Sequence, residues 1–223
     1  MTKPEELERA KADVQEELQA LAKDRPEKLE VAVIAVKSKL PYKAMAIRGA
    51  LIWRVEELGR CAIEALERND VAVGLMLTRG VMECTALMGC LVEVVEKRNS
   101  ADTAELSEVL DKMLYGWKND AELPEAINVM TLLKHLNRRF ESSQRNYEHL
   151  SEFAHPNWGG VLGLFSRTDN DRFTTYFGRF EERIAGPRST GVMALAASLS
   201  VFRYDYLRAA RVNEGWLSEL EPL

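Results

Sequence analysis

The chain has 223 residues, of which 46% are hydrophobic and 29% are charged, and its formal net charge is −5. This length and hydrophobic fraction are typical of a single domain that buries a core. The acidic balance disfavours an extended binding surface for nucleic acid or for an anionic membrane.

The N-terminal segment, residues 1–25, is charged from its start and has no apolar stretch of the kind that marks a secretory signal. Residues 3–23 are predicted to form an amphipathic helix with a narrow apolar stripe: Leu7, Val14, Leu18 and Leu21. Such a stripe packs on the body of its own chain or pairs with a partner chain, and packing on the body is the default. We therefore divide the chain into an arm, 1–25, and a single helical-bundle domain, 26–223.

Three cysteines, Cys61, Cys84 and Cys90, lie within apolar helical patterns. Their odd number and their position indicate buried, reduced thiols. Together with the N-terminus, they favour a cytoplasmic location.

A short helix over 27–39 and a longer one over 41–68 are predicted next. Residues 71–98 then form a helix that is apolar nearly all round, with Asn69 and Asp70 as its cap. Its length alone permits a membrane span, but Arg79, Glu83 and Glu93 are costly within a bilayer. We interpret it as the central buried helix of a bundle, without a membrane role.

Further helices are predicted over 103–118, over 124–140, and from Ser142 or Ser143 to a stop at Pro156. Two β-prone runs, 161–167 and 172–178, flank the turn-rich TDND and predict a small hairpin that lies as a flap near His155. Gly186 and Pro187 are expected to break the chain before a long C-terminal helix that starts at Ser189 or Thr190, with Trp216 in a docked, frayed tail. The fold class is therefore an all-α multi-helix bundle with a small β-hairpin insertion, about 161–178.

The candidate ligand-binding site combines two helices. Tyr147, Ser151 and His155 follow one another at steps of four, which places them along one helical stripe. Arg79 and Glu83 are also four apart, on the central helix, where a charged pair has to be satisfied. They are either a structural ion pair or, with the other three, the lining of a polar pocket.

His155 is the candidate catalytic residue, because an imidazole oriented by a carboxylate suits acid–base chemistry. Glu152 and His155 also make half of a Glu-x-x-His metal motif, but the other histidines lack such a glutamate partner. The cysteine spacings do not resemble a zinc site, and no nucleotide-binding glycine motif is present. We expect neither a metal nor another cofactor.

A basic run gives candidate phosphate-binding residues: Arg138, Arg139 and Arg145, with Lys134 and His135 beside them. Such a run is usually a solvated face. Next to His155 it could hold a phosphate through arginine forks and a lysine charge.

The segments LTRGVMECTALMGCL and YEHLSEFAHPN together resemble an Arg-x-x-x-Glu helix followed by a Tyr-x-x-Leu-Ser-x-x-x-His-Pro helix end. This pairing is similar to a group of uncharacterised bacterial helical proteins related to the HEPN superfamily. The resemblance covers roughly residues 70–178, and it implies a bundle, often dimeric, with the polar residues at its end or at its dimer seam. In HEPN ribonucleases an arginine precedes the histidine with four to six residues between them. The positions that correspond here hold Glu148, His149 and Leu150, so only His155 is carried over.

The first functional hypothesis is a non-catalytic, HEPN-like binding or interaction protein. Its pocket holds a small polar or anionic ligand through Arg79, Glu83, Tyr147, Ser151 and His155. The alternative is a metal-independent endoribonuclease of toxin–antitoxin or phage-defence type, with RNA as its partner. In both cases we expect a homodimer.

Overall fold

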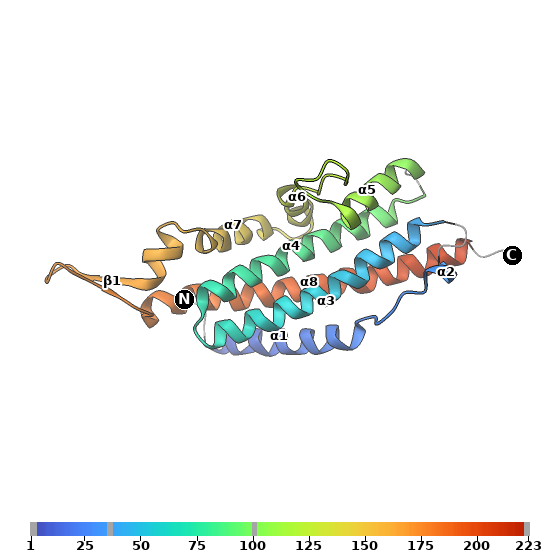
Figure 1. The fold of residues 1–223 in the computed structure, drawn as a ribbon. Coiled ribbons are helices and arrows are strands. Elements are labelled where there is room, and N and C mark those ends of the chain that lie inside the picture. The colour runs from blue at the N-terminus through green and yellow to red at the C-terminus, as the bar shows by residue number, and fades with distance from the viewer. Residues whose placement is uncertain (1–3, 35–37, 100–101, 221–223) are drawn as a thin grey trace.

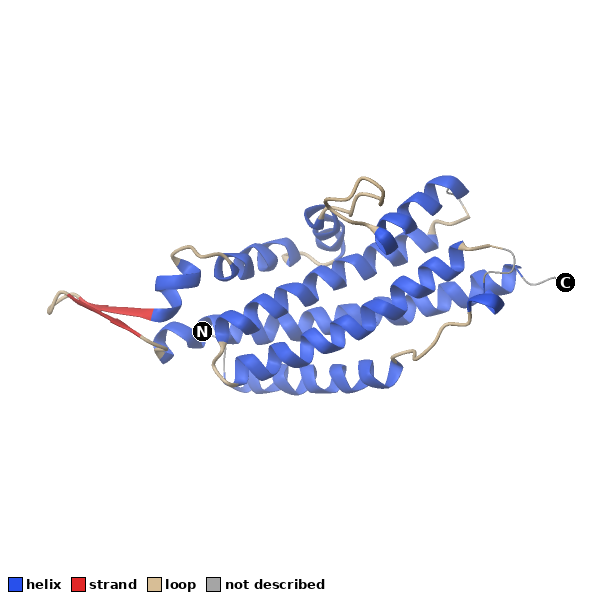
Figure 2. Cartoon of the chain, in the orientation of Figure 1, coloured by secondary structure: helices blue, strands red, loops and turns tan. Residues whose placement is uncertain are grey.

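The computed structural model describes residues 4–34, 38–99 and 102–220. In chain order (Figure 1) its elements are α1 (Pro4–Asp24), α2 (Val31–Ile34), α3 (Leu40–Glu67), α4 (Val71–Glu96), α5 (Thr103–Tyr115), α6 (Val129–Arg139), α7 (Ser143–Ala154), η1 (Gly159–Gly163), β1 (Ser166–Asp169), β2 (Thr174–Phe177) and α8 (Glu181–Leu220). The prediction of an all-α bundle with one small hairpin is confirmed (Figure 2).

Four long helices, α1, α3, α4 and α8, lie side by side and enclose the main core (Figure 1). A second apolar cluster lies where α6 and α7 pack against α4. Helix α4 therefore contacts α3 and α8 on one side and α6 and α7 on the other. This central position explains its apolar composition, because helices cover most of its circumference.

Within the described residues, α4 is the one helix that is long and apolar enough to cross a membrane. Of its most apolar 18-residue window, 61% is buried inside the protein. The bundle thus accounts for the apolar character of this helix.

The predicted N-terminal helix packs in cis against α3 and α8. Val14 and Leu21 are fully buried and belong to the main core, and Leu7 packs at its edge. Gly59 permits this close approach, since a Cβ there would lie 2.9 Å from Leu18 Cδ2. Residue 3 of the predicted range lies outside the described residues.

The prediction of a helix from Pro124 is wrong, because α6 begins only at Val129. Asn128 caps it by accepting a hydrogen bond from the Met130 N–H at 2.8 Å. The residues before α6 form a loop. A hydrogen bond from the backbone N–H of Trp117 to the Pro124 carbonyl, at 2.9 Å, closes this loop. The preceding helix, α5, ends at Tyr115, three residues earlier than predicted.

The predicted helix over 27–39 is reduced to α2, and residues 35–37 of that range lie outside the described part. Asp70 occupies the predicted cap position of α4, but its side chain makes no capping hydrogen bond. Its carboxylate instead pairs with Arg68 and Arg179.

The predicted hairpin is present but shorter than expected. Ser166 pairs with Phe177 at one end of its ladder, and Asp169 pairs with Thr174 at the other. Residues 159–163 belong to the helical turn η1 instead. The hairpin projects beyond the end of the bundle (Figure 1). None of its residues, 166–177, lines the pocket to which His155 belongs, so the prediction of a flap over that site is wrong. The turn η1 directly precedes the hairpin, and the periodicity of the sequence did not indicate it.

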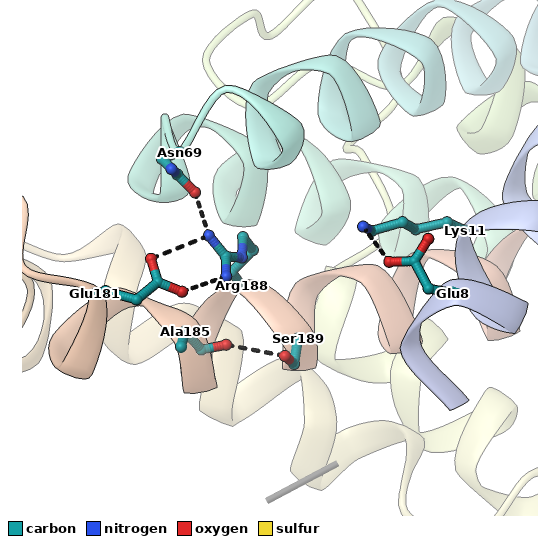
Figure 3. Close-up of polar contacts among 7 residues, drawn as sticks. All are labelled: Glu8, Lys11, Asn69, Glu181, Ala185, Arg188 and Ser189. Atoms are coloured by element: carbon teal, nitrogen blue, oxygen red, sulfur yellow. Dashed lines mark hydrogen bonds and ion pairs between the residues drawn. The ribbon is translucent and has the colours of Figure 1, made fainter. Parts of the chain in front are cut away.

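The predicted break at Gly186 and Pro187 is also wrong, because α8 runs through both residues. Pro187 removes one backbone donor in the second turn of the helix. The Arg188 guanidinium secures these first turns by hydrogen bonds to Asn69 and to the Glu181 carboxylate (Figure 3). Trp216 is 7% exposed and lies within α8 rather than in a frayed tail.

Candidate functional site

Three side chains of the predicted site meet between α4 and α7. Arg79 Nη2 donates to the Tyr147 hydroxyl at 2.7 Å, and that hydroxyl donates to Glu83 Oε1 at 2.8 Å. Arg79 Nε also lies 3.3 Å from Glu83 Oε1. The spacing of four along α4 brings the ions together, and the packing of α7 on α4 supplies the phenol between them.

Burial differs among the members of this group. Tyr147 is 4% exposed, whereas the Arg79 and Glu83 side chains are 28% and 34% exposed. The pair therefore lies at the edge of the apolar cluster and is only partly dehydrated, which limits its contribution to stability.

The pKa of Tyr147 is raised, first by burial and then by its hydrogen bond to Glu83, while Arg79 acts in the opposite direction. The phenol thus remains a neutral donor to the Glu83 carboxylate. In this state it holds the two ions of α4 in a fixed arrangement.

A surface pocket of about 560 Å³ opens beside this group. Of the predicted site residues, Arg79, Tyr147, Ser151 and His155 line it, and Glu83 supports it through Tyr147 without lining it. The structure therefore brings the predicted residues together. Their role in binding a ligand stays a prediction.

Ser151 and His155 contribute differently to the pocket. The Ser151 hydroxyl donates to the Tyr147 carbonyl at 2.8 Å within α7, so it is not poised as a nucleophile toward His155. His155 ends α7 with an extended backbone, and its side chain is exposed. Among the described residues, no side chain forms a hydrogen bond with its imidazole that could orient it for acid–base work.

Gly160 fixes the turn that follows His155. A Cβ at this position would lie 2.2 Å from the His155 carbonyl oxygen and 2.8 Å from that of Phe153. Only glycine permits this close approach. The chain therefore turns sharply directly after His155, which is one of the residues that line the pocket.

Sequence reasoning missed one wall of the pocket. Lys118, the capping residue Asn128 and the first two residues of α6, Val129 and Met130, line it as well. Lys118 is exposed and has no ion pair with the part of the chain described. The N-terminus of α6 adds a partial positive charge. Asn128 is a typical helix-capping residue, so the sequence could have indicated that a helix begins at Val129. The prediction instead placed the start of this helix at Pro124.

Two acidic residues, Glu148 and Glu152, complete the lining. Their carboxylates accept hydrogen bonds from Gln144 and Asn157, at 2.8 and 2.7 Å. The pocket thus carries both signs of charge, with Arg79 and Lys118 as its cations and the two acids on α7.

The predicted phosphate-binding arginines do not line this pocket. Arg139 forms a two-point ion pair with the buried Asp205 of α8. Arg138 and Arg145 are exposed. His135 Nδ1 faces Glu93 at 3.4 Å. The basic run is therefore divided between an internal ion pair and solvent.

Across the ranges 4–34, 38–99 and 102–220, no group of three or more His, Cys, Asp or Glu side chains could hold a metal ion. The cysteines in these ranges are free thiols, and burial raises the pKa of Cys90 to about 11. No family model matches the sequence, and no curated protein or solved structure matches the chain. The class of protein that fold and site define is a four-helix core with a mixed-charge pocket on its α6–α7 side.

Proposed function

We propose that this chain is a HEPN-like helical binding protein whose α4–α6–α7 pocket holds a small polar or anionic ligand. One observation carries the proposal: the Arg79 guanidinium lines the pocket and is held in place by Tyr147 and Glu83. A fixed guanidinium binds a carboxylate or phosphate with little loss of side-chain entropy.

The remaining lining supports the same ligand class. Lys118 and the N-terminus of α6 add positive potential on the same pocket. Glu148 and Glu152 disfavour a highly charged polyanion and favour hydroxyl or amino groups elsewhere on the ligand. A singly charged phosphate or carboxylate that also carries hydrogen-bond donors meets both requirements.

The experiment is titration calorimetry with lactate, gluconate and inorganic phosphate as probes. We expect at least one probe to bind and to raise the unfolding free energy, by about 2.7 kcal/mol at a hundredfold excess over Kd. Lys118→Ala should weaken binding without affecting the fold, because this side chain makes no ion pair within the described residues. Arg138→Ala is the matched control outside the pocket. Absence of binding by all three probes contradicts the proposal.

The ribonuclease alternative rests on a separate observation, namely that His155 lines the same pocket as Arg79 and Lys118. An imidazole beside two cations suits phosphodiester cleavage without a metal. Purified protein should then cleave RNA in the presence of a chelator, and His155→Ala should abolish the cleavage. Intact RNA after incubation eliminates this candidate.

The homodimer also remains a proposal. Large aromatic side chains are exposed in the hairpin, Phe173 and Phe177, and directly before η1, Trp158. Exposed apolar surface of this kind is typical of interaction sites. Light scattering after gel filtration should give twice the mass of 25.3 kDa, and a monomeric mass rejects the dimer.

A further inference from the structure

A second pocket, of about 390 Å³, lies between the segment that follows α1 and the N-terminal half of α3. It shares no residue with the Arg79 pocket. Its apolar lining consists of Pro26, Leu29, Val31, Tyr42, Met45 and Ala46. One half-buried cation, Arg48, interrupts this lining.

Arg48 forms no ion pair with the described residues, although the carboxylates of Asp24 and Glu214 are near enough to raise its pKa against the effect of burial. Its Nε donates to the Tyr206 carbonyl at 3.0 Å, and its Cζ lies 3.6 Å from the centroid of the Tyr206 ring. No carboxylate of residues 4–34, 38–99 or 102–220 comes within 4.0 Å of its nitrogens. Burial accordingly lowers the pKa of Arg48, although the surrounding charges act in the opposite direction.

The other half-buried arginines behave differently. Each of them pairs with a carboxylate: Arg25, Arg79, Arg98, Arg139, Arg188, Arg203 and Arg208. Arg48 is therefore the exception within the described chain. The one hydrogen bond of its guanidinium within the described chain comes from Nε, so the terminal nitrogens are available to an anion.

The walls of this pocket are held in place from several sides. Trp53 Nε1 donates to the Pro26 carbonyl at 2.9 Å, and the Arg25 guanidinium lies 4.2 Å from the centroid of the Trp53 ring. The Tyr206 hydroxyl donates to the Asp24 carbonyl at 2.9 Å. These contacts fix the segment after α1 against α3 and α8, so the pocket exists before a ligand arrives.

We propose that this pocket binds a small organic acid, with its carboxylate on the Arg48 guanidinium and its apolar body against Tyr42 and Met45. The planar guanidinium matches a carboxylate in geometry. The apolar lining selects an acid with a hydrocarbon or aromatic body over a bare anion. Glu27 and Lys28 line the pocket as exposed residues, and Lys28 is already paired with Glu30.

The test is calorimetric titration of the full chain with phenylacetate. Phenylacetamide, which has the same shape but no charge, and inorganic phosphate serve as reference ligands. We expect phenylacetate to bind and both references to bind roughly ten- to hundredfold more weakly, as the loss of a charge-assisted hydrogen bond or of the apolar body implies. Equal binding of the acid and the amide overturns the proposal, as does undetectable binding of the acid.

Two variants locate the site. Arg48→Gln should remove the preference for the acid over the amide, and Ala46→Phe should fill the pocket while leaving Arg48 in place. Arg60→Gln, an exposed arginine on the same helix, is the matched control. Circular dichroism verifies that each variant is folded. Phenylacetate binding that survives Ala46→Phe in folded protein places the ligand elsewhere and refutes the assignment. Because Lys118→Ala affects only the first pocket, failure here is distinguishable from failure of the proposed function.

Discussion

Arg139 and Asp205 join α6 to α8 through two parallel hydrogen bonds, of 2.8 and 2.6 Å, although 66 residues separate them in sequence. Asp205 is fully buried, and the Arg139 side chain is 20% exposed. The hydrogen bonds to this carboxylate raise the pKa of Arg139. The pair therefore fixes the helix whose N-terminus lines the candidate ligand pocket.

Removal of one partner of this ion pair should strongly destabilise the protein. Arg139→Ala leaves the Asp205 carboxylate buried without a counter-ion, and we expect the unfolding free energy to fall by about 3–5 kcal/mol in urea denaturation. The exposed neighbour Arg138→Ala should change it by less than about 0.5 kcal/mol. The double variant Arg139→Met with Asp205→Leu should recover much of the loss, and a double variant as unstable as the single one would contradict this account.

Gly89 of α4 makes room for this ion pair. A Cβ at Gly89 would lie 2.9 Å from Arg139 Nη1 and 3.2 Å from Asp205 Oδ2. Gly89→Ala should therefore destabilise the protein by about 1–3 kcal/mol through overpacking, despite the better helix propensity of alanine.

The matched control is Gly215→Ala in α8, where a Cβ meets nothing within 4 Å. There the same substitution should stabilise the protein by about 0.5–1 kcal/mol. Thermal unfolding of both variants measures the contrast, and an equal effect at the two sites would show that packing at Gly89 does not matter.

Tyr147 should make stability depend on alkaline pH. Its folded-state pKa is raised, so its contribution to the unfolding free energy is fully present below the unfolded value of about 10 and is lost as pH rises through the folded value. Tyr206 has a raised pKa for the same first reason, burial, and adds to the effect. Tyr147→Phe should therefore flatten the decline above pH 10 in denaturant titrations. A slope identical to that of the unmodified protein would exclude a coupled Tyr147.

Gly160→Ala should disturb the turn that places His155. Because the clash is with backbone carbonyls, no side chain can move aside to relieve it. We expect weaker ligand binding and shifted backbone amide resonances for residues 153–161, with the bundle core intact. Gly159→Ala, whose nearest contact of 3.4 Å is ordinary, is the control. Equal spectra for the two variants would remove Gly160 from this role.

The sequence by itself determined the helical class, the central position of residues 71–96 and the two local sets of site residues, because each depends on helical periodicity. A spacing of four places Arg79 next to Glu83, and Tyr147 in line with Ser151 and His155, in any α-helix. The Tyr-x-x-Leu-Ser-x-x-x-His-Pro pattern likewise marked the end of α7 correctly, since proline restricts the residue before it.

Only the tertiary structure decided which faces meet. The contact of Tyr147 with both ions of α4, the entry of Lys118 into the pocket and the pairing of Arg139 with Asp205 all join segments far apart in the chain. It also decided that α8 continues through Pro187, where packing and the Arg188 contacts override a local tendency to break. Local spacing fixes neighbours along one helix, whereas contacts between helices depend on how the whole core is filled.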